Sequence, residues 1–311
     1  MDSLAQNRAQ RQRALAIAFG ITATILVAEV VGGILTNSLA LLADAGHMAS
    51  DIEALGLSLT ALWLASRPAS SRRTYGFHRA EVLAALVNSL TLIAIAGYVF
   101  WEASRRFADP PQVQSGPMLF IASLGLIANL ISASILFRQR NVSLNVRSAF
   151  LHVLGDAAAS VGVIVAGVIM LTTGQLIADP LISVFIGALI LAGAFRLTWE
   201  TTQVLLEATP PGVSTPDIQQ AMLQTRGVQG IHDLHVWTVT SGFISLSAHV
   251  ETDQAHDQHG ILVDLRKLLA QRFGIEHATI QLETSALHQE LETCCGVDTE
   301  EVAGEHALYH G

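Results

Sequence analysis

The stretch ALAIAFGITATILVAEVVGGIL, residues 14–35, contains a single charged side chain, Glu29. An apolar run of about 20 residues is long enough to cross the ~30 Å hydrocarbon core of a bilayer as a helix. Five similar runs follow at about 39–65, 82–102, 117–137, 148–172 and 178–199, separated by short segments with Arg, Asn or Pro. This pattern predicts an α-helical polytopic membrane protein with six transmembrane helices.

The composition and the distribution of arginine support this prediction. Hydrophobic residues make up 51% of the chain and charged residues only 14%, whereas a soluble protein is about 25% charged. A soluble enzyme is therefore excluded. If the N-terminus lies inside, eleven Arg residues fall on the inner side and only Arg105 and Arg106 on the outer side. The positive-inside rule then predicts that both termini are cytoplasmic.

The net charge of −9 is concentrated in the last third of the chain. Residues 208–311 contain four basic residues, 14 acidic residues and nine of the 12 His. This balance argues against nucleic acid and for cationic partners, including metal ions. We predict an N-terminal cytoplasmic segment (1–13), a six-helix transport domain (14–207), a cytoplasmic metal-binding and dimerisation domain (208–285) and a flexible acidic tail (286–311).

The polar domain at 208–285 has the element order helix, strand, strand, helix, strand. In its strands IHDLHVWTVT and FISLSAHVET, β-forming residues alternate with other residues, and Thr240-Ser241-Gly242 lies between the strands, which is typical of a hairpin. The order predicts a ferredoxin-like α+β (αββαβ) fold, with an antiparallel sheet covered by two helices on one face.

Charged side chains at bilayer depth cost about 2.5 to 3.5 kcal/mol on insertion scales, so they are functional candidates. The strings LLADAGHMASDIEA in the second span and AFLHVLGDAAAS in the fifth contain nearly all of them. His47 and Asp51 are four residues apart, as are His152 and Asp156, so each pair occupies one helix face. Together the two faces offer two imidazoles and two carboxylates, a four-coordinate set that suits Zn²⁺.

Other interpretations of these polar residues are open. Each His–Asp pair alone is also consistent with a salt link between helices, but two copies in different spans favour a metal site. Asp44 and Glu53 lie off the face of His47, and we predict that they face water or support the ligands. For Glu29 and Asn129, an interhelical hydrogen bond is favoured over a role in a pathway.

These residues lie in segments that resemble the cation diffusion facilitator family, specifically the zinc-exporting branch related to bacterial cobalt-zinc-cadmium resistance exporters. The resemblance covers roughly residues 12–285 and is carried by SLALLADAGHMASD, TYGFHRAEVLAALVN, NVRSAFLHVLGDAAASVGV, LLEATP, IHDLHVWTVTSG and LSAHV. It implies a homodimer of six-span protomers, with paired cytoplasmic domains, that exports a divalent metal in exchange for protons. It assigns the transport site to the two His–Asp pairs and implies a location in the bacterial inner membrane.

The resemblance also implies a metal site in the cytoplasmic domain. His232 and His249 match ligand positions, and Glu283 matches a further ligand. His235 is also a candidate, because His232, His235 and His249 cluster on the two hairpin strands, whose pairing could bring His232 near His249. His232 and His235 are alternatively ordinary hydrogen-bonded strand residues. Two further pairs are candidates. Cys294 and Cys295 are either soft Zn²⁺ ligands or chance surface cysteines. Arg79 and Glu81 either lie at the membrane interface or help to lock the dimer.

The predicted function is therefore Zn²⁺ export by proton antiport, without an organic cofactor, with Cd²⁺ or Co²⁺ as alternative cargo. Metal ligands must be deprotonated, so metal and protons compete for the same four groups. An intramembrane metallohydrolase would need a general base beside its ligands, as in H-E-x-x-H, and no such string occurs. A metal sensor or scaffold is the second rival, although a sensor does not need polar residues at bilayer depth.

Overall fold

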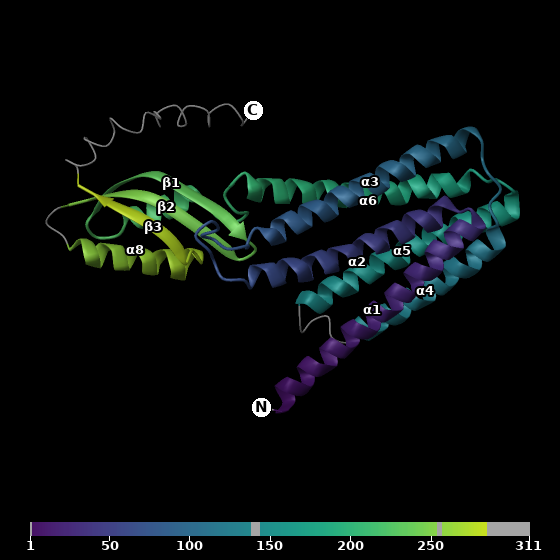
Figure 1. The fold of residues 1–311 in the computed structure, drawn as a ribbon, viewed down its shortest axis with the longest axis horizontal. Coiled ribbons are helices and arrows are strands. Elements are labelled where there is room, and N and C mark those ends of the chain that lie inside the picture. Colours follow the sequence, from purple (N-terminus) through teal and green to yellow (C-terminus); the bar gives the residue numbers. More distant parts are fainter. Residues whose placement is uncertain (1, 138–143, 254–256, 285–311) are drawn as a thin grey trace. The chain divides into compact units, whose positions relative to one another are not determined.

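The computed structural model of the chain describes residues 2–137, 144–253 and 257–284, which form two compact units divided between Thr201 and Thr202. The first unit is a bundle of long helices: α1 Asp2–Thr36, α2 Leu39–Ala65, α3 Ala80–Ala108, α4 Ser115–Phe137, α5 Leu144–Thr173 and α6 Ala178–Leu205 (Figure 1). All six contain a stretch long and apolar enough to span a membrane, which confirms the predicted count. The first helix begins earlier than its apolar run, because the Ala, Gln and Arg residues before position 14 also favour a helix.

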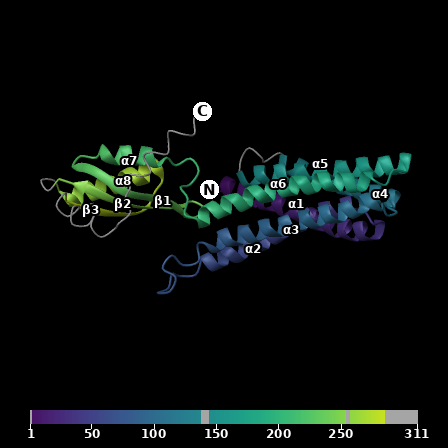
Figure 2. The ribbon, with the colours of Figure 1, turned by 90° about the horizontal axis from the view of Figure 1, so that it is seen from above.

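The helices pack closely through small side chains. α1 contacts α2 and α4, α4 contacts α5, and α2 contacts α3. In Figures 1 and 2, α3 and α6 run side by side, and the hydroxyl of Thr198 on α6 donates to Ser89 on α3 at 2.9 Å. A Cβ at Gly167 would lie 2.7 Å from Leu119, so α4 and α5 approach as closely as they do because position 167 has no side chain.

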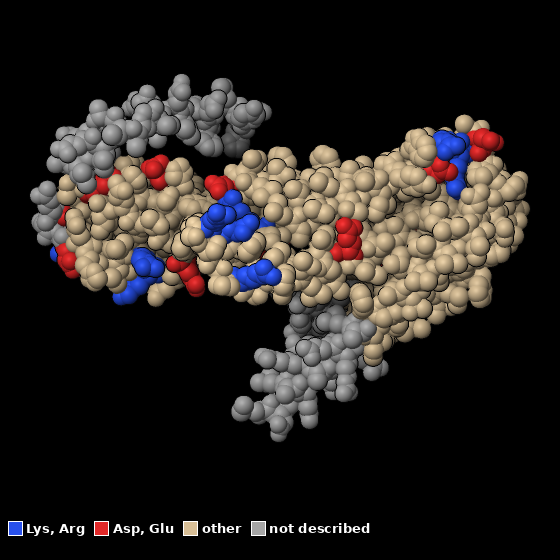
Figure 3. Space-filling model, viewed as in Figure 1, with Lys and Arg blue, Asp and Glu red and all other residues tan. Residues whose placement is uncertain are grey.

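The surface of the helical unit is mostly uncharged. On the face seen in Figure 3, its Lys, Arg, Asp and Glu side chains gather near the two ends, with one acidic patch between them. Large hydrophobic side chains such as Leu35, Phe120 and Phe195 are exposed on the helices. An apolar belt between charged ends is the surface that a lipid bilayer covers, so the chain is an integral membrane protein.

A buried polar network closes the end of the bundle at the turn between α1 and α2. Asp179, in the first turn of α6, accepts hydrogen bonds from the Ser38 hydroxyl at 2.6 Å and from the backbone N–H of Leu39 at 2.8 Å. A carboxylate at a helix N-terminus satisfies the unpaired amides there and is favoured by the helix dipole. Arg106 of α3 donates to Asn37 at 2.7 Å, so this network joins α2, α3 and α6.

The second unit is a small sheet with two helices: α7 Thr215–Leu223, β1 Val228–Thr240, β2 Phe243–Thr252, α8 Gln258–Phe273 and β3 His277–Glu283. This order confirms the predicted αββαβ fold. Ser214 caps α7 and Asp257 caps α8, while Gly274 ends α8 with a φ of 68°. The helices and the sheet share one apolar core that includes Ile218, Met222, Leu246, Leu265 and Leu269.

The predicted antiparallel sheet is wrong for its last strand. The strand order is β1-β2-β3; β1 pairs antiparallel with β2, but β2 pairs parallel with β3, with Ser245 opposite His277. The reason is the connection between them. Helix α8 joins β2 to β3, and a helical crossover is long enough to return the chain in its original direction, as a tight hairpin is not.

Candidate metal sites

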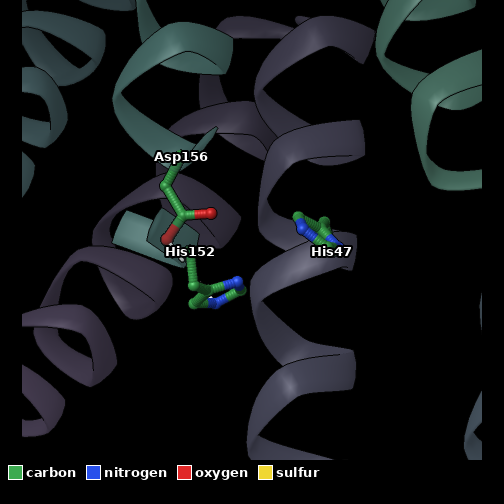
Figure 4. A group of neighbouring side chains, drawn as sticks. All are labelled: His47, His152 and Asp156. Atoms are coloured by element: carbon green, nitrogen blue, oxygen red, sulfur yellow. Dashed lines mark ion pairs between the residues drawn. The ribbon is translucent and has the colours of Figure 1, made fainter. Parts of the chain in front are cut away.

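Helices α2 and α5 bring together the two His–Asp pairs. The Nε2 atom of His152 lies 3.1 Å from Oδ2 of Asp51 and 3.7 Å from Oδ2 of Asp156, and Nε2 of His47 lies 4.0 Å from Oδ2 of Asp51. His47, His152 and Asp156, which Figure 4 draws as sticks, each offer a ligand atom within 4.8 Å of the others. Asp51 is not part of this group of three and joins it through His152. We call these four residues the helix site.

The four side chains of the helix site differ in burial. Asp156 is 1% exposed, whereas the side chains of His47, Asp51 and His152 are 31%, 29% and 38% exposed. Neither carboxylate oxygen of Asp156 has a hydrogen-bond partner among the residues that the structure describes. Two imidazoles and two carboxylates carrying two negative charges match the charge and the donor preference of one divalent cation such as Zn²⁺.

The predicted supporting residues beside the helix site have different environments. Asp44 does not face water, because it is only 1% exposed. It precedes His47 by three residues, so the two side chains are neighbours on the surface of α2. Glu53 accepts a hydrogen bond from Thr91 of α3 at 3.3 Å, so its carboxylate ties α2 to α3. Arg79 directly precedes α3 and Glu81 lies in its first turn; their interface and dimer roles stay predictions.

The interhelical hydrogen bond predicted for Glu29 and Asn129 does not form. Both residues are 1% exposed, yet their side-chain oxygens and the Asn129 amide nitrogen have no hydrogen-bond partner within the described parts of the chain. The two side chains are buried in the bundle, on α1 and α4, without pairing. A single polar residue in an apolar run of sequence does not reveal whether it has a partner.

In the second unit, all three strands contribute to a cluster that we call the strand site. His232 of β1 lies opposite His249 of β2, with ring centroids 5.1 Å apart. Oε2 of Glu283, on β3, lies 3.2 Å from Nε2 of His232, and Oε1 lies 2.8 Å from Nδ1 of His249. Ligand atoms of the three residues all lie within 4.8 Å of one another, so the register of the sheet assembles a potential metal site.

The carboxylate of Glu283 is buried and yet well stabilised. Burial alone would raise its pKa, but the hydrogen bonds from Gln281 and His232 and the positive charge that His249 and His232 can carry outweigh it, so the pKa is lowered. The bond from the Gln281 amide is 2.7 Å long. Glu283 is therefore held ionised, which is the form that binds a metal ion.

The other predicted ligands of the second unit lie apart from the strand site. His235 is 64% exposed, and its Nε2 lies 2.7 Å from Oδ1 of Asp233. A β-bulge between His232 and His235, where Asp233 has a φ of 52°, turns His235 aside. It also places Oδ2 of Asp233 3.7 Å from Nε2 of His249. Cys294 and Cys295 lie outside the described residues.

Comparison with known proteins gives matches over both units. Residues 15–206 match the family described as "Cation efflux transmembrane domain", and residues 210–285 match "Cation efflux protein, cytoplasmic domain". The "Metal cation efflux system protein CzcD" of Cupriavidus metallidurans is 43% identical over 89% of this chain and 88% of its own length. The "Zinc transporter ZitB" of Escherichia coli is 41% identical, with 89% and 88% covered.

Two further matches extend this comparison. The "Cadmium, cobalt and zinc/H(+)-K(+) antiporter" of Bacillus subtilis is 38% identical over 96% of this chain and 98% of its own. A solved structure described as "Metal-bound C-terminal domain of the CzcD transporter from Cuprividus metallidurans" is 42% identical, covering 23% of this chain and 99% of that one with a TM-score of 0.22. The curated relatives are named as efflux proteins, transporters or antiporters, not as enzymes.

Proposed function

The chain belongs to the cation efflux family, and from this premise we propose that it exports Zn²⁺ from the cytoplasm in exchange for protons. The observation that carries the proposal is the convergence of His47 and Asp51 of α2 with His152 and Asp156 of α5 at membrane depth. Charged groups are costly there and are retained where they bind or carry ions. The protein is accordingly a transporter of divalent metal cations and not an enzyme.

The donor set favours zinc. Two imidazole nitrogens and two carboxylate oxygens suit the tetrahedral coordination of Zn²⁺, and the two charges of the ion cancel those of Asp51 and Asp156. Cd²⁺ and Co²⁺ accept the same donors and are the alternative cargo. Relatives named for zinc alone and for cadmium, cobalt and zinc together both occur.

The same four side chains account for exchange with protons. Zn²⁺ binds imidazole and carboxylate groups only when they are deprotonated, so its arrival displaces protons and its departure allows them to return. His152 suits this role because its Nε2 lies near the carboxylates of both Asp51 and Asp156. A protonated His152 supplies part of the positive charge that the metal otherwise provides. A site that binds either ion in turn, and opens to alternate sides, couples the two flows.

Location and assembly complete the proposal. We propose that both termini lie in the cytoplasm, which the asymmetry of Arg residues supports, and that the protein lies in the bacterial inner membrane. The second unit, which matches the cytoplasmic domain of the family, then lies beneath the membrane. We propose that it pairs with a second copy, so that the transporter is a homodimer.

The strand site is proposed to hold Zn²⁺ as a structural or regulatory ion. His232, His249 and Glu283 would bind it, and the fit rests on a fully buried carboxylate placed between two imidazoles. A bound Zn²⁺ would add bonds across all three strands and so stabilise the fold of this unit.

Metal flux into proteoliposomes with an imposed pH gradient tests the function. The parent protein should accumulate Zn²⁺ against its gradient, and a panel of divalent ions should rank Cd²⁺ and Co²⁺ behind it. Asp51→Ala should abolish accumulation, whereas Glu53→Gln, on the same helix but bonded to Thr91, should retain it. Parental flux in Asp51→Ala would contradict the assignment of the site. Zn²⁺ binding without flux in the parent would favour the sensor.

A further inference from the structure

Several polar side chains outside the helix site are buried between its helices and their neighbours. Glu29, Asp44, Asn129 and Ser160, from four different helices, are each 1% exposed. Both oxygens of Glu29, Oδ1 of Asp44, both polar atoms of the Asn129 amide and the Ser160 hydroxyl have no hydrogen-bond partner among the described residues. The helix-site function described above does not use any of them.

The position of Glu29 is set by a glycine. A Cβ at Gly125 of α4 would lie 2.8 Å from Oε1 of Glu29 and 3.6 Å from the hydroxyl of Ser160. The Glu29 carboxylate therefore lies in the space that a side chain at position 125 would fill, between α1, α4 and α5. Ser160 follows Asp156 by one turn of α5, so Glu29 is close to the helix site but on its outer side in the proposed orientation.

Among the described residues, Glu29 forms no ion pair with a Lys or an Arg. The charged groups that face it are Asp44 of α2 and Asp156 of α5, both acidic; α4 presents the neutral Asn129. Asp44 in turn faces Asp156 and Asp51. Residues 17–61, 115–137 and 150–173 contain no Lys or Arg. An isolated carboxylate in an apolar interior is neutralised rather than left ionised.

A proton is the neutralising ion that this geometry favours. Within the described residues, the groups whose ligand atoms converge as a metal requires are His47, His152 and Asp156 of the helix site and the three residues of the strand site. Glu29 and Asp44 belong to neither group. A proton needs a single carboxylate oxygen and no converging set, so it fits Glu29 where a divalent cation does not.

We propose that Glu29 is a proton-binding carboxyl, separate from the metal ligands, that loses its proton when Zn²⁺ occupies the helix site and regains one after Zn²⁺ has left. This proposal rests on the proposed proton-coupled export. When Zn²⁺ arrives from the cytoplasm and binds near Asp156, it repels a proton on Glu29, so the O–H bond breaks, the proton leaves to the cytoplasmic side and the carboxylate remains. On the return step a proton from the outer side re-forms the O–H bond and is carried inward with Glu29 neutral.

Two flux assays on the full-length protein in proteoliposomes test this role, with radioactive Zn²⁺ as the probe. The first measures net uptake driven by a pH gradient; the second measures exchange of labelled for unlabelled Zn²⁺ at equal pH, which needs no proton-bound return. Glu29→Gln, which mimics the neutral carboxyl, should lower net uptake by about tenfold or more while exchange stays within about twofold of the parent. Glu29→Asp should recover part of the net uptake.

A matched control and a second readout keep the test decisive. Ser132→Ala removes a buried hydroxyl from α4 and leaves every carboxyl in place, so it should leave both assays unchanged. If Glu29→Gln does not fold, the pH profile of net uptake by Glu29→Asp should shift while its exchange does not. Equal loss of net uptake and exchange in Glu29→Gln, or no loss in either, would overturn the proposal. A parent that exchanges Zn²⁺ but ignores the pH gradient would instead refute proton-coupled export itself.

Discussion

The helix site and the strand site use almost the same donors but hold them in different ways. Each contains two imidazoles and at least one buried carboxylate. In the strand site, Glu283 contacts His232 and His249 and accepts a hydrogen bond from Gln281. In the helix site, the buried Asp156 has no hydrogen-bond partner among the described residues.

This difference separates an ion that passes through from an ion that stays. Outer partners that orient a ligand raise metal affinity, and their loss typically costs about 10- to 100-fold. The strand site has such a partner and stands on three hydrogen-bonded strands, so it is suited to retain its ion. The helix site lies on two helices held by side-chain packing, so its ligands can move apart. A carrier must release what it binds, and a site without fixed partners permits release.

The most direct test of this difference between the two sites is to remove one imidazole from each. His152→Ala takes away the nitrogen that lies near both Asp51 and Asp156, and should reduce pH-driven Zn²⁺ uptake by at least about 100-fold. His249→Ala removes the corresponding group from the strand site and should leave uptake within about fivefold of the parent. Proteoliposome flux measures both. Comparable losses would mean that the strand site takes part in each transport cycle.

The second prediction concerns retention of zinc by the strand site. In an Asp51→Ala background, which silences the helix site, Glu283→Gln should weaken Zn²⁺ retention by about 100-fold, because a charged ligand is replaced by a neutral amide. Competition with a chelator of known affinity, followed by metal analysis, gives the change. Asp264→Asn removes an exposed negative charge from α8 and serves as the control. Retention that falls equally in both variants would point to net charge and not to a site.

Much of the fold and of the helix site is predictable because the signals are local. The spans follow from runs of apolar residues, and the spacing of four in His47–Asp51 and His152–Asp156 fixes each pair on one helix face. The turn Ser241-Gly242 puts His232 and His249 on paired strands of one hairpin, although two register shifts between the turn and His232 set which residues lie opposite each other. In each case a short stretch of sequence determines the geometry.

The features that sequence patterns miss depend on the packing of distant segments. The direction of β3 depends on where α8 returns the chain, and the bulge at Asp233 depends on the pairing of both strands. Burial of Asp44 and the unpaired state of Glu29 depend on which helices face them. Gly125 shows this clearly: only the packed bundle reveals that its missing side chain makes room for Glu29.

A third prediction sharpens the comparison through metal choice. His47→Asp changes the helix site from two nitrogen donors to one and adds an oxygen donor, and harder oxygen donors favour Mn²⁺ relative to Zn²⁺. The ratio of Mn²⁺ to Zn²⁺ flux should therefore rise by about tenfold. The same change in the strand site, His249→Asp, should leave the flux ratio unchanged. A shift in the ratio with His249→Asp would show that the strand site selects the cargo.

The smallest expected effect tests whether a hydrogen bond alone distinguishes a retaining site from a releasing one. Gln281→Ala leaves all three strand-site ligands in place but removes the 2.7 Å bond to Glu283. Because Gln281 itself is exposed, water can replace its amide, and zinc retention should fall by about tenfold at most, the low end for an outer partner. Thr279→Ala, at an exposed position on the same side of β3, is the matched control. If Gln281→Ala retains zinc as well as Thr279→Ala does, retention is due to the ligands and the rigid sheet. The two sites would then differ because one stands on strands and the other on helices, and not because only one carboxylate accepts a hydrogen bond.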